Sequence, residues 1–126
     1  MLVTMITPEF PPTCGGIGYY AYYLSRALAS RGLQVEMIVR GGKGEGEYQG
    51  VNFKRIPTRG LPPLNNGSFS KAVRKNLHRR APDLLHIHSS SMPLIRGQVP
   101  EVVTSHSCIR AITPLFFRPI RDVESL

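Results

Sequence analysis

The stretch "MLVTMITPEFPPTCGGIGYYAYYLSRALASRGLQVEMIVR", residues 1–40, has the order strand, loop, helix, strand. Leu2–Thr7 is an almost continuous apolar run, typical of a strand buried in a parallel sheet. Apolar residues then recur every three or four positions, and Gly32 marks the end of that helix. The expected core-facing stripe is Ile17, Tyr20, Ala21, Leu24, Ala27 and Leu28. With the apolar run 35–39, this order predicts parallel strands joined by a right-handed crossover.

The rest of the chain continues the alternation of strands and helices. Strands are expected at 51–56, 84–87 and 102–104, and a helix at 69–80 whose Phe69, Val73 and Leu77 share one side. Surface turns or loops are expected at 41–50 and 61–67, a short helix at 92–97, and a partly helical tail at 108–126. The pattern predicts an α/β, doubly wound, Rossmann-like and mostly parallel sheet in one domain, residues 1–126.

The composition indicates which kinds of partner and which cellular location to expect for the chain. Sixteen Lys and Arg against eight Asp and Glu give a net charge of +8, which favours anionic ligands or surfaces. Cys14 and Cys108 form no CxxC pair, so free thiols and no metal site are expected. The apolar N-terminus lacks a basic lead, and no apolar run approaches the roughly 20 residues of a membrane span. We therefore expect a cytoplasmic protein.

The loop after the first strand contains the first candidate site. Gly15 and Gly16 stand at the start of a helix, where unpaired N–H groups favour a phosphate, although a turn without chemistry explains a Gly-Gly pair as well. Gly16, Gly18 and Ala21 also match the dinucleotide fingerprint G-x-G-x-x-A. The long proline loop and Arg40 at the end of the second strand fit that fingerprint poorly. A phosphorylated dinucleotide remains an alternative because Arg40 suits a 2′-phosphate.

The stretch from Thr7 to residue 39 resembles the start of a retaining glycosyltransferase of the GT-B fold, in the family-4 type. That resemblance rests on Gly15-Gly16, on the helix pattern that follows with Leu33 where the family often has His, and on two later stretches, "PDLLHIHSS" at 82–90 and "VVTSHS" at 102–107. It implies transfer of a sugar from a nucleotide-sugar, as substrate and without a cofactor, to a sugar or lipid-linked acceptor. It also implies that this is the acceptor-side amino-terminal domain, incomplete at its carboxyl end and without the donor-binding domain, and therefore inactive alone.

The same resemblance, with the rule that ligands bind at the carboxyl ends of parallel strands, indicates the site residues. Gly15, Gly16 and His88 are expected to bind substrate or donor, and His106 to be catalytic by hydrogen-bonding the sugar or the acceptor rather than by acting as a base. We expect His86 and His88 to face opposite ways from their strand, with at least one of them structural. No metal is expected.

The basic helix at 69–80 is the other candidate surface. Lys71, Arg74, Lys75, Arg79 and Arg80 cover the side away from the apolar stripe. A solvated face is the commoner explanation, but such a helix also suits peripheral binding to an anionic membrane surface, and it shows no nucleic-acid-reading module. A non-catalytic fragment that binds anionic lipid or polymer is a further alternative. Self-association is expected through an unpaired sheet edge and the apolar run at 115–117.

Overall fold

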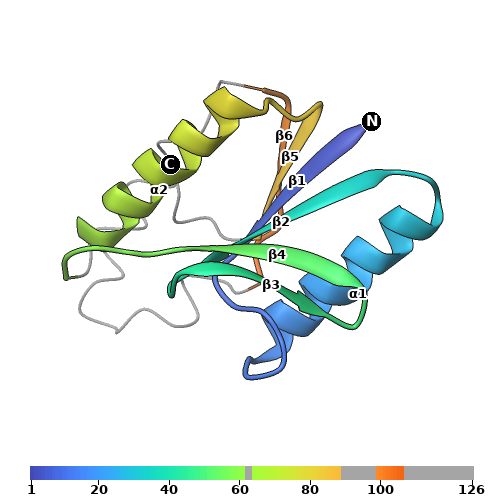
Figure 1. The fold of residues 1–126 in the computed structure, drawn as a ribbon, viewed down its shortest axis with the longest axis horizontal. Helices are drawn as coiled ribbons and strands as arrows, with labels where there is room; N and C mark the ends of the chain where they lie inside the picture. Colours follow the sequence, from blue (N-terminus) through green and yellow to red (C-terminus); the bar gives the residue numbers. More distant parts are fainter. Residues whose placement is uncertain (62–63, 89–98, 107–126) are drawn as a thin grey trace, which may run out of the picture.

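The computed structural model describes residues 1–61, 64–88 and 99–106 (Figure 1). The elements in chain order are β1 (Leu2–Thr7), α1 (Gly16–Ser30), β2 (Gln34–Arg40), β3 (Gly44–Tyr48), β4 (Val51–Ile56), α2 (Leu64–Arg79), β5 (Leu84–Ile87) and β6 (Glu101–Val103). In this part of the chain the strands form one six-stranded sheet of order β3-β4-β2-β1-β5-β6. All neighbours pair in parallel except β3, which runs antiparallel to β4.

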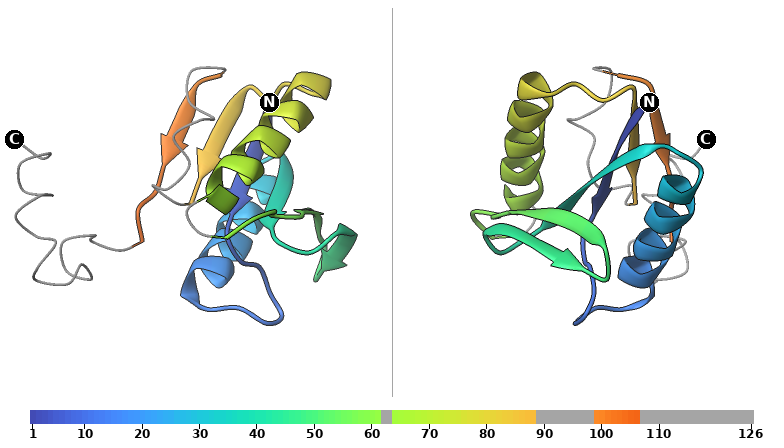
Figure 2. Two further views of the ribbon diagram at one scale, coloured as in Figure 1. Left: turned by 90° about the vertical axis from the view of Figure 1, so that its left-hand side faces the viewer. Right: turned by 45° about the vertical axis from the view of Figure 1, so that its right-hand side comes forward.

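The two helices cover opposite faces of the sheet (Figure 2, right). The chain leaves β1 through α1 and adds β2 on one side, and later leaves β4 through α2 and adds β5 on the other side of β1. The strand order therefore reverses between β1 and β5, which is the topological switch point of a doubly wound sheet. The predicted α/β, Rossmann-like and mostly parallel fold is confirmed.

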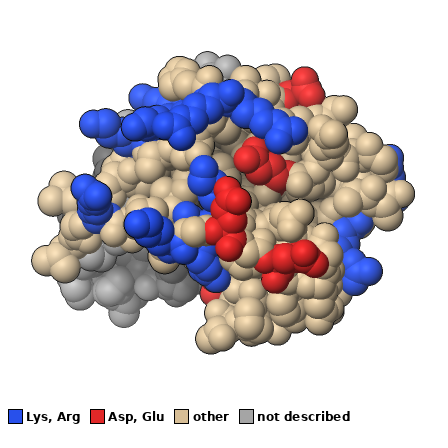
Figure 3. All heavy atoms as spheres, viewed as in Figure 1, with Lys and Arg blue, Asp and Glu red and all other residues tan. Residues whose placement is uncertain are grey.

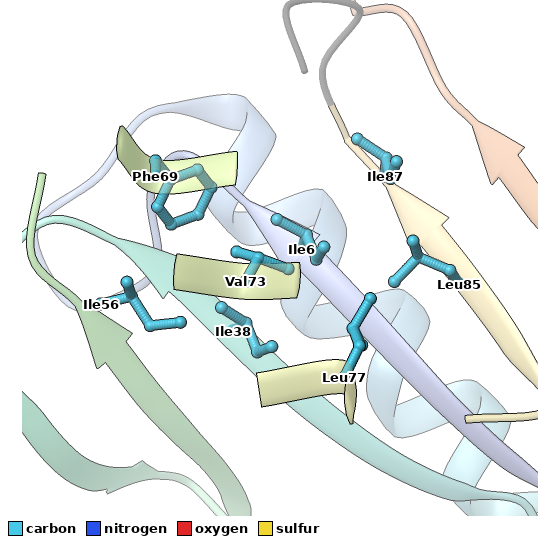
Figure 4. Packing of buried hydrophobic residues seen from close by; sticks show 8 residues of the cluster. All are labelled: Ile6, Ile38, Ile56, Phe69, Val73, Leu77, Leu85 and Ile87. Carbon is cyan, nitrogen blue, oxygen red and sulfur yellow. The ribbon is translucent and has the colours of Figure 1, made fainter. Parts of the chain in front are cut away.

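The core between α2 and the sheet comes from the predicted stripe of that helix (Figure 4). Phe69, Val73 and Leu77 point from successive turns onto the sheet. They pack against Ile6, Ile38, Ile56, Leu85 and Ile87, all of which are buried. In each strand the residues on this face alternate with residues that face α1, as the two-residue period of a strand requires.

On the other face the buried stripe of α1 differs from the predicted one. The buried residues are Gly18, Ala21, Tyr22 and Ser25, while Tyr20 is 47% exposed and Ala27 is exposed. The cause is Phe10 in the loop after β1, which is 1% exposed and places its ring 6.2 Å from that of Tyr22. Because of this contact with a residue of the proline-rich loop, the buried face of α1 is shifted by about one residue from the predicted face.

The predicted turn at 41–50 is wrong, since it contains the edge strand β3. Gly46 lies over the ring of Phe53, and a Cβ there would be 2.7 Å from the Phe53 ring. Glu45 and Glu47 are exposed, as charged residues at sheet edges often are. Gln49 and Gly50 both have positive φ, 44° and 85°, which is the backbone of a two-residue hairpin turn.

The boundaries of the later elements differ only slightly from the predicted ones. Helix α2 begins at Leu64 and ends at Arg79, so it takes up part of the predicted loop at 61–67. On the far edge β6 leaves Val102 and Val103 45% and 38% exposed. The predicted helix at 92–97, the tail at 108–126 and its apolar run at 115–117 lie outside the described residues.

Candidate functional site

Three loops meet at the carboxyl edge of the sheet beside the switch point. The loop after β1 leads into α1 at Gly15 and Gly16, His88 follows β5, and His106 follows β6. Backbone pairing continues past the strands, because the His88 N–H donates to the Ile6 carbonyl at 2.9 Å and the Thr104 N–H to the Ile87 carbonyl at 2.8 Å. The ring of Tyr20 on α1 makes edge-to-face contacts with both His88 and His106. Of the predicted residues, His88 and His106 are therefore brought together, and Tyr20 connects them to α1.

The histidines form a connected group. The rings of His86 and His88 stack with centroids 4.3 Å apart, and Nδ1 of His88 lies 3.2 Å from Nε2 of His106. The expectation that His86 and His88 face opposite ways is wrong, because residues two apart in a strand share a face. Nε2 of His86 lies 2.8 Å from the hydroxyl of Thr104, so His86 is held by a partner on the neighbouring strand.

Burial keeps two of these imidazoles neutral. The pKa of His88 is lowered from 6.5 to about 4, first by burial and then by the charges that His86 and His106 would carry. The pKa of His86 is also lowered, by burial and then by His106. At neutral pH the His88 ring is therefore uncharged, and one of its two nitrogens carries a hydrogen.

Two site residues were missed by the sequence reasoning. Tyr20 was placed in the core stripe, but its ring centroid lies 4.9 Å from that of His106 and 5.6 Å from that of His88, with about half of the residue exposed. Glu9, in the proline-rich loop, accepts a hydrogen bond from the Gly18 N–H at 3.2 Å. An acidic residue shortly before a predicted helix start was the signal for Glu9.

The two glycines at the start of α1 differ in the space around them. A Cβ at Gly16 would meet nothing within 4 Å, so the helix start is open there, whereas one at Gly15 would lie 3.1 Å from the Glu9 carboxylate. Gly15 is the N-cap residue, and no side chain caps the helix from that position. Among the described residues the space at Gly16 is therefore open, and the carboxylate of Glu9 occupies part of the helix N-terminus.

The surroundings of Gly18 do not favour the alternative of a dinucleotide-binding loop. In that fingerprint the second glycine lets the ligand diphosphate approach the backbone. Here a Cβ at Gly18 would lie 2.5 Å from Sγ of Cys14 and 3.2 Å from the backbone carbon of Glu9, so this glycine packs against its own loop. Arg40 lies over the ring of Phe69 at 5.8 Å, rather than at the loop.

Gly18→Ala is expected to lower the free energy of unfolding by about 1–3 kcal/mol, as overpacking of a closed site does. The displaced atoms would be Cys14 and the backbone of Glu9, neither of which is the end of a flexible side chain. Gly16→Ala, two residues earlier in the same helix, is the matched control. It should leave the free energy of unfolding unchanged or raise it, because alanine favours the helix. Urea unfolding of the two variants measures the difference, and equal stabilities would contradict this account.

A second candidate surface lies along α2. A groove of about 750 Å³ is lined by Pro57, Arg59, Ser68, Lys71, Ala72, Arg74, Lys75 and His78. On the face seen in Figure 3, Lys and Arg side chains form a band over the region of α2, and several Asp and Glu side chains lie below it. Of the predicted basic residues, Lys71, Arg74 and Lys75 line this groove, while the exposed Arg79 and Arg80 lie beyond it. Arg59 joins them from the segment after β4, which the sequence reasoning missed.

The described residues contain no helix long and apolar enough to cross a membrane. In the same part of the chain, no three His, Cys, Asp or Glu side chains are grouped so as to hold a metal ion. Cys14 is a free thiol whose pKa is raised by burial and by the nearby Glu9 carboxylate.

Comparison with known proteins agrees with this architecture. The chain is similar to a sucrose-phosphate synthase from Thermosynechococcus elongatus, with a TM-score of 0.70 and 15% identity, over 97% of this chain and 39% of that protein. A second, shorter structure of that synthase matches with a TM-score of 0.60 and 16% identity, over 83% of this chain and 64% of the other. No curated protein matches the sequence. The chain thus spans about two fifths of the length of the first of these structures.

The doubly wound sheet, its polar switch-point edge and this structural likeness define a Rossmann-like domain of the GT-B type. Residues 14–124 match the family model described as Glycosyltransferase Family 4. Because that match covers most of the chain, the protein belongs to glycosyltransferase family 4.

Proposed function

We propose that this chain is the acceptor-side domain of a retaining glycosyltransferase that moves a sugar from a nucleotide-sugar to an acceptor hydroxyl. The observation that supports the proposal is the contact of His88 and His106, which follow two neighbouring parallel strands, with each other and with Tyr20 on the first helix. The open space at Gly16 would admit a ligand to the start of α1, and Tyr20 on the same helix contacts the exposed His106.

In this proposal His106 is a hydrogen-bonding residue. Its Nε2 is engaged by His88, so a ligand would bind through Nδ1. In a retaining mechanism the leaving phosphate takes the proton of the acceptor hydroxyl, and His106 is not required as a base. Its contribution is a positioned hydrogen bond to the sugar or the acceptor, which counts most where charge develops in the transition state.

The test joins this domain to a donor-binding domain and measures transfer from a panel of nucleotide-sugars. His106→Ala is expected to lower kcat/KM by about 10²-fold, as the loss of one preorganised donor does. Gly16→Val should also lower activity, because its side chain would fill the space at the helix start. Neither variant should lower the Tm greatly, since His106 is exposed and Gly16 has no close neighbours.

The chain alone serves as the comparison in the same assay. We expect no transfer by it, because in this proposal the donor-binding domain orients the leaving diphosphate opposite the acceptor. Robust turnover by the 126-residue chain would contradict the proposed division of labour. Full activity in both variants would mean that the site is wrong, and losses that only follow the Tm would make the two residues structural.

The groove along α2 supports a second proposal, peripheral binding to an anionic membrane surface. Four Lys and Arg side chains and His78 line it, and Ser68 holds the Arg59 backbone from α2, donating to its carbonyl and accepting from its N–H at 3.0 Å. The groove lies beside α2, and none of the residues that line it belongs to the Gly16–His106 edge, so a bound headgroup would leave that edge accessible.

Lys71→Gln with Lys75→Gln should weaken binding to anionic vesicles about 30-fold, since each basic residue near such a surface contributes about 1 kcal/mol. Both side chains are exposed, so the fold should be unaffected. The matched control is Arg31→Gln with Lys43→Gln, which removes two exposed charges outside the groove. Vesicle sedimentation at low and high salt measures the effect. Equal weakening by both pairs would indicate attraction by net charge alone.

A further inference from the structure

The imidazole of His88 is an unusual feature of the candidate site. It is 1% exposed, between His86 on its own strand, His106 beyond the neighbouring strand and Tyr20 on α1. Its Nδ1 lies 3.2 Å from Nε2 of His106, while its Nε2 is buried and has no hydrogen-bond partner among the described residues. A buried ring with one bonded and one unbonded nitrogen restricts where its hydrogen can be.

A neutral His88–His106 pair shares one hydrogen in that bond. If Nδ1 of His88 carries it, the buried Nε2 of His88 is a lone pair, and the hydrogen of His106 is on its Nδ1. If instead Nε2 of His106 carries it, the hydrogen of His88 is on its buried Nε2, where the described residues offer no acceptor. A buried N–H without an acceptor is costly, and such donors are rarer than under-used acceptors. The first arrangement is therefore favoured.

We propose that His88 is a positioning residue that holds His106 in its Nδ1–H tautomer and so presents an N–H donor to an oxygen of the bound sugar or acceptor. This deepens the proposed function and rests on it for the identity of the ligand. His106 is itself exposed, and an isolated imidazole would exchange between its two neutral tautomers. The buried partner removes that freedom before a ligand arrives, which is the kind of preorganisation that strengthens a binding or catalytic hydrogen bond.

The surroundings hold the pair in this geometry. The ring of Tyr20 packs in T-shaped contacts against both imidazoles, with its centroid 4.9 Å from that of His106 and 5.6 Å from that of His88, which limits their rotation. His86 stacks on His88 at 4.3 Å and is itself bonded to Thr104. The lowered pKa of His88 keeps this ring neutral at physiological pH.

The test is long-range ¹H–¹⁵N NMR of the whole chain with labelled histidine at about pH 8, above the ordinary histidine pKa. His106 is expected to show a protonated Nδ1 and an unprotonated Nε2. In His88→Leu, which removes the donor, His106 should give the averaged signals of both tautomers. His86→Leu is the matched control, since it removes a stacked imidazole but not the bond to His106, and it should leave the His106 tautomer unchanged.

A protonated Nε2 at His106 in the unaltered chain, or a mixture of the two His106 tautomers, would overturn the proposal. An unchanged His106 tautomer in His88→Leu would overturn it as well. If His88→Leu fails to fold, the tautomer of the unaltered chain and of His86→Leu still decides, because a mixture in either would refute the assignment. Addition of UDP-glucose, UDP alone and a simple methyl glucoside then tests the proposed function separately. A fixed tautomer with no response of His106 to any of them would count against the sugar site while leaving the positioning role of His88 intact.

Discussion

Phe69→Ala is expected to lower the free energy of unfolding by about 3–5 kcal/mol, as the loss of a fully buried aromatic ring does. Phe69 is 0% exposed and belongs to the cluster that joins α2 to the sheet (Figure 4). Its neighbours in that cluster include Val73 on the next turn and Ile38 on a central strand, which cannot close the cavity without moving backbone. Urea unfolding monitored by circular dichroism measures the change.

The matched control is Leu64→Ala on the same helix. Leu64 is 76% exposed, so its truncation should change the free energy of unfolding by less than about 0.5 kcal/mol. A small loss in Phe69→Ala, similar to that in Leu64→Ala, would mean that α2 is not held on the sheet by this stripe. The placement of the basic groove beside α2 would then also be wrong.

Acid is expected to destabilise the fold by about 3 kcal/mol through His88 alone between pH 6.5 and pH 4. The pKa of His88 is 6.5 when unfolded and about 4 in the folded chain, because burial and the neighbouring histidines disfavour the charged ring. Below pH 6.5 the unfolded chain therefore binds a proton that the folded chain does not. Stability contributed by the neutral ring is complete above pH 6.5 and is lost as the pH falls toward 4, and His86 acts in the same direction.

The measurement is the free energy of unfolding in urea across this pH range for the unaltered chain and for His88→Leu. The slope should be smaller in His88→Leu, because its titration is removed. His78→Gln, which changes an exposed histidine on α2, is the control and should keep the original slope. The same slope in the unaltered chain and in His88→Leu would show that His88 titrates normally and is not buried as described.

Much of the fold follows from local periodicity. The apolar run at Leu2–Thr7, the four-residue repeat of Phe69, Val73 and Leu77, and the strand at Val51–Ile56 each predict an element that the structure confirms. Local sequence was a poorer guide at 41–50, where Gly46 and two glutamates indicate a turn but form an edge strand. The strand forms because Gly46 accommodates the Phe53 ring of its partner, a contact that no periodicity within the segment reports.

The sequence indicated at which edge of the sheet the candidate site lies, but not which side chains contact one another there. The rule for parallel sheets places His88 and His106 at the ligand edge, because both follow apolar strands. The contact of Tyr20 with them was not predictable, since the helical stripe of α1 placed Tyr20 in the core. In the structure Phe10 packs against Tyr22, and Tyr20 lies against the histidines.

By itself the sequence determined the alternation of elements, the edge of the sheet where polar residues gather, and the apolar and basic sides of α2. Only the tertiary structure decided the pairing of His88 with His106, the use of Glu9 at the start of α1 and the union of Arg59 with α2 in one groove. The physical reason is the range of the interactions. Periods of two and 3.6 residues are set by backbone geometry within a segment, whereas contacts between segments depend on strand order, register and the packing of loop side chains.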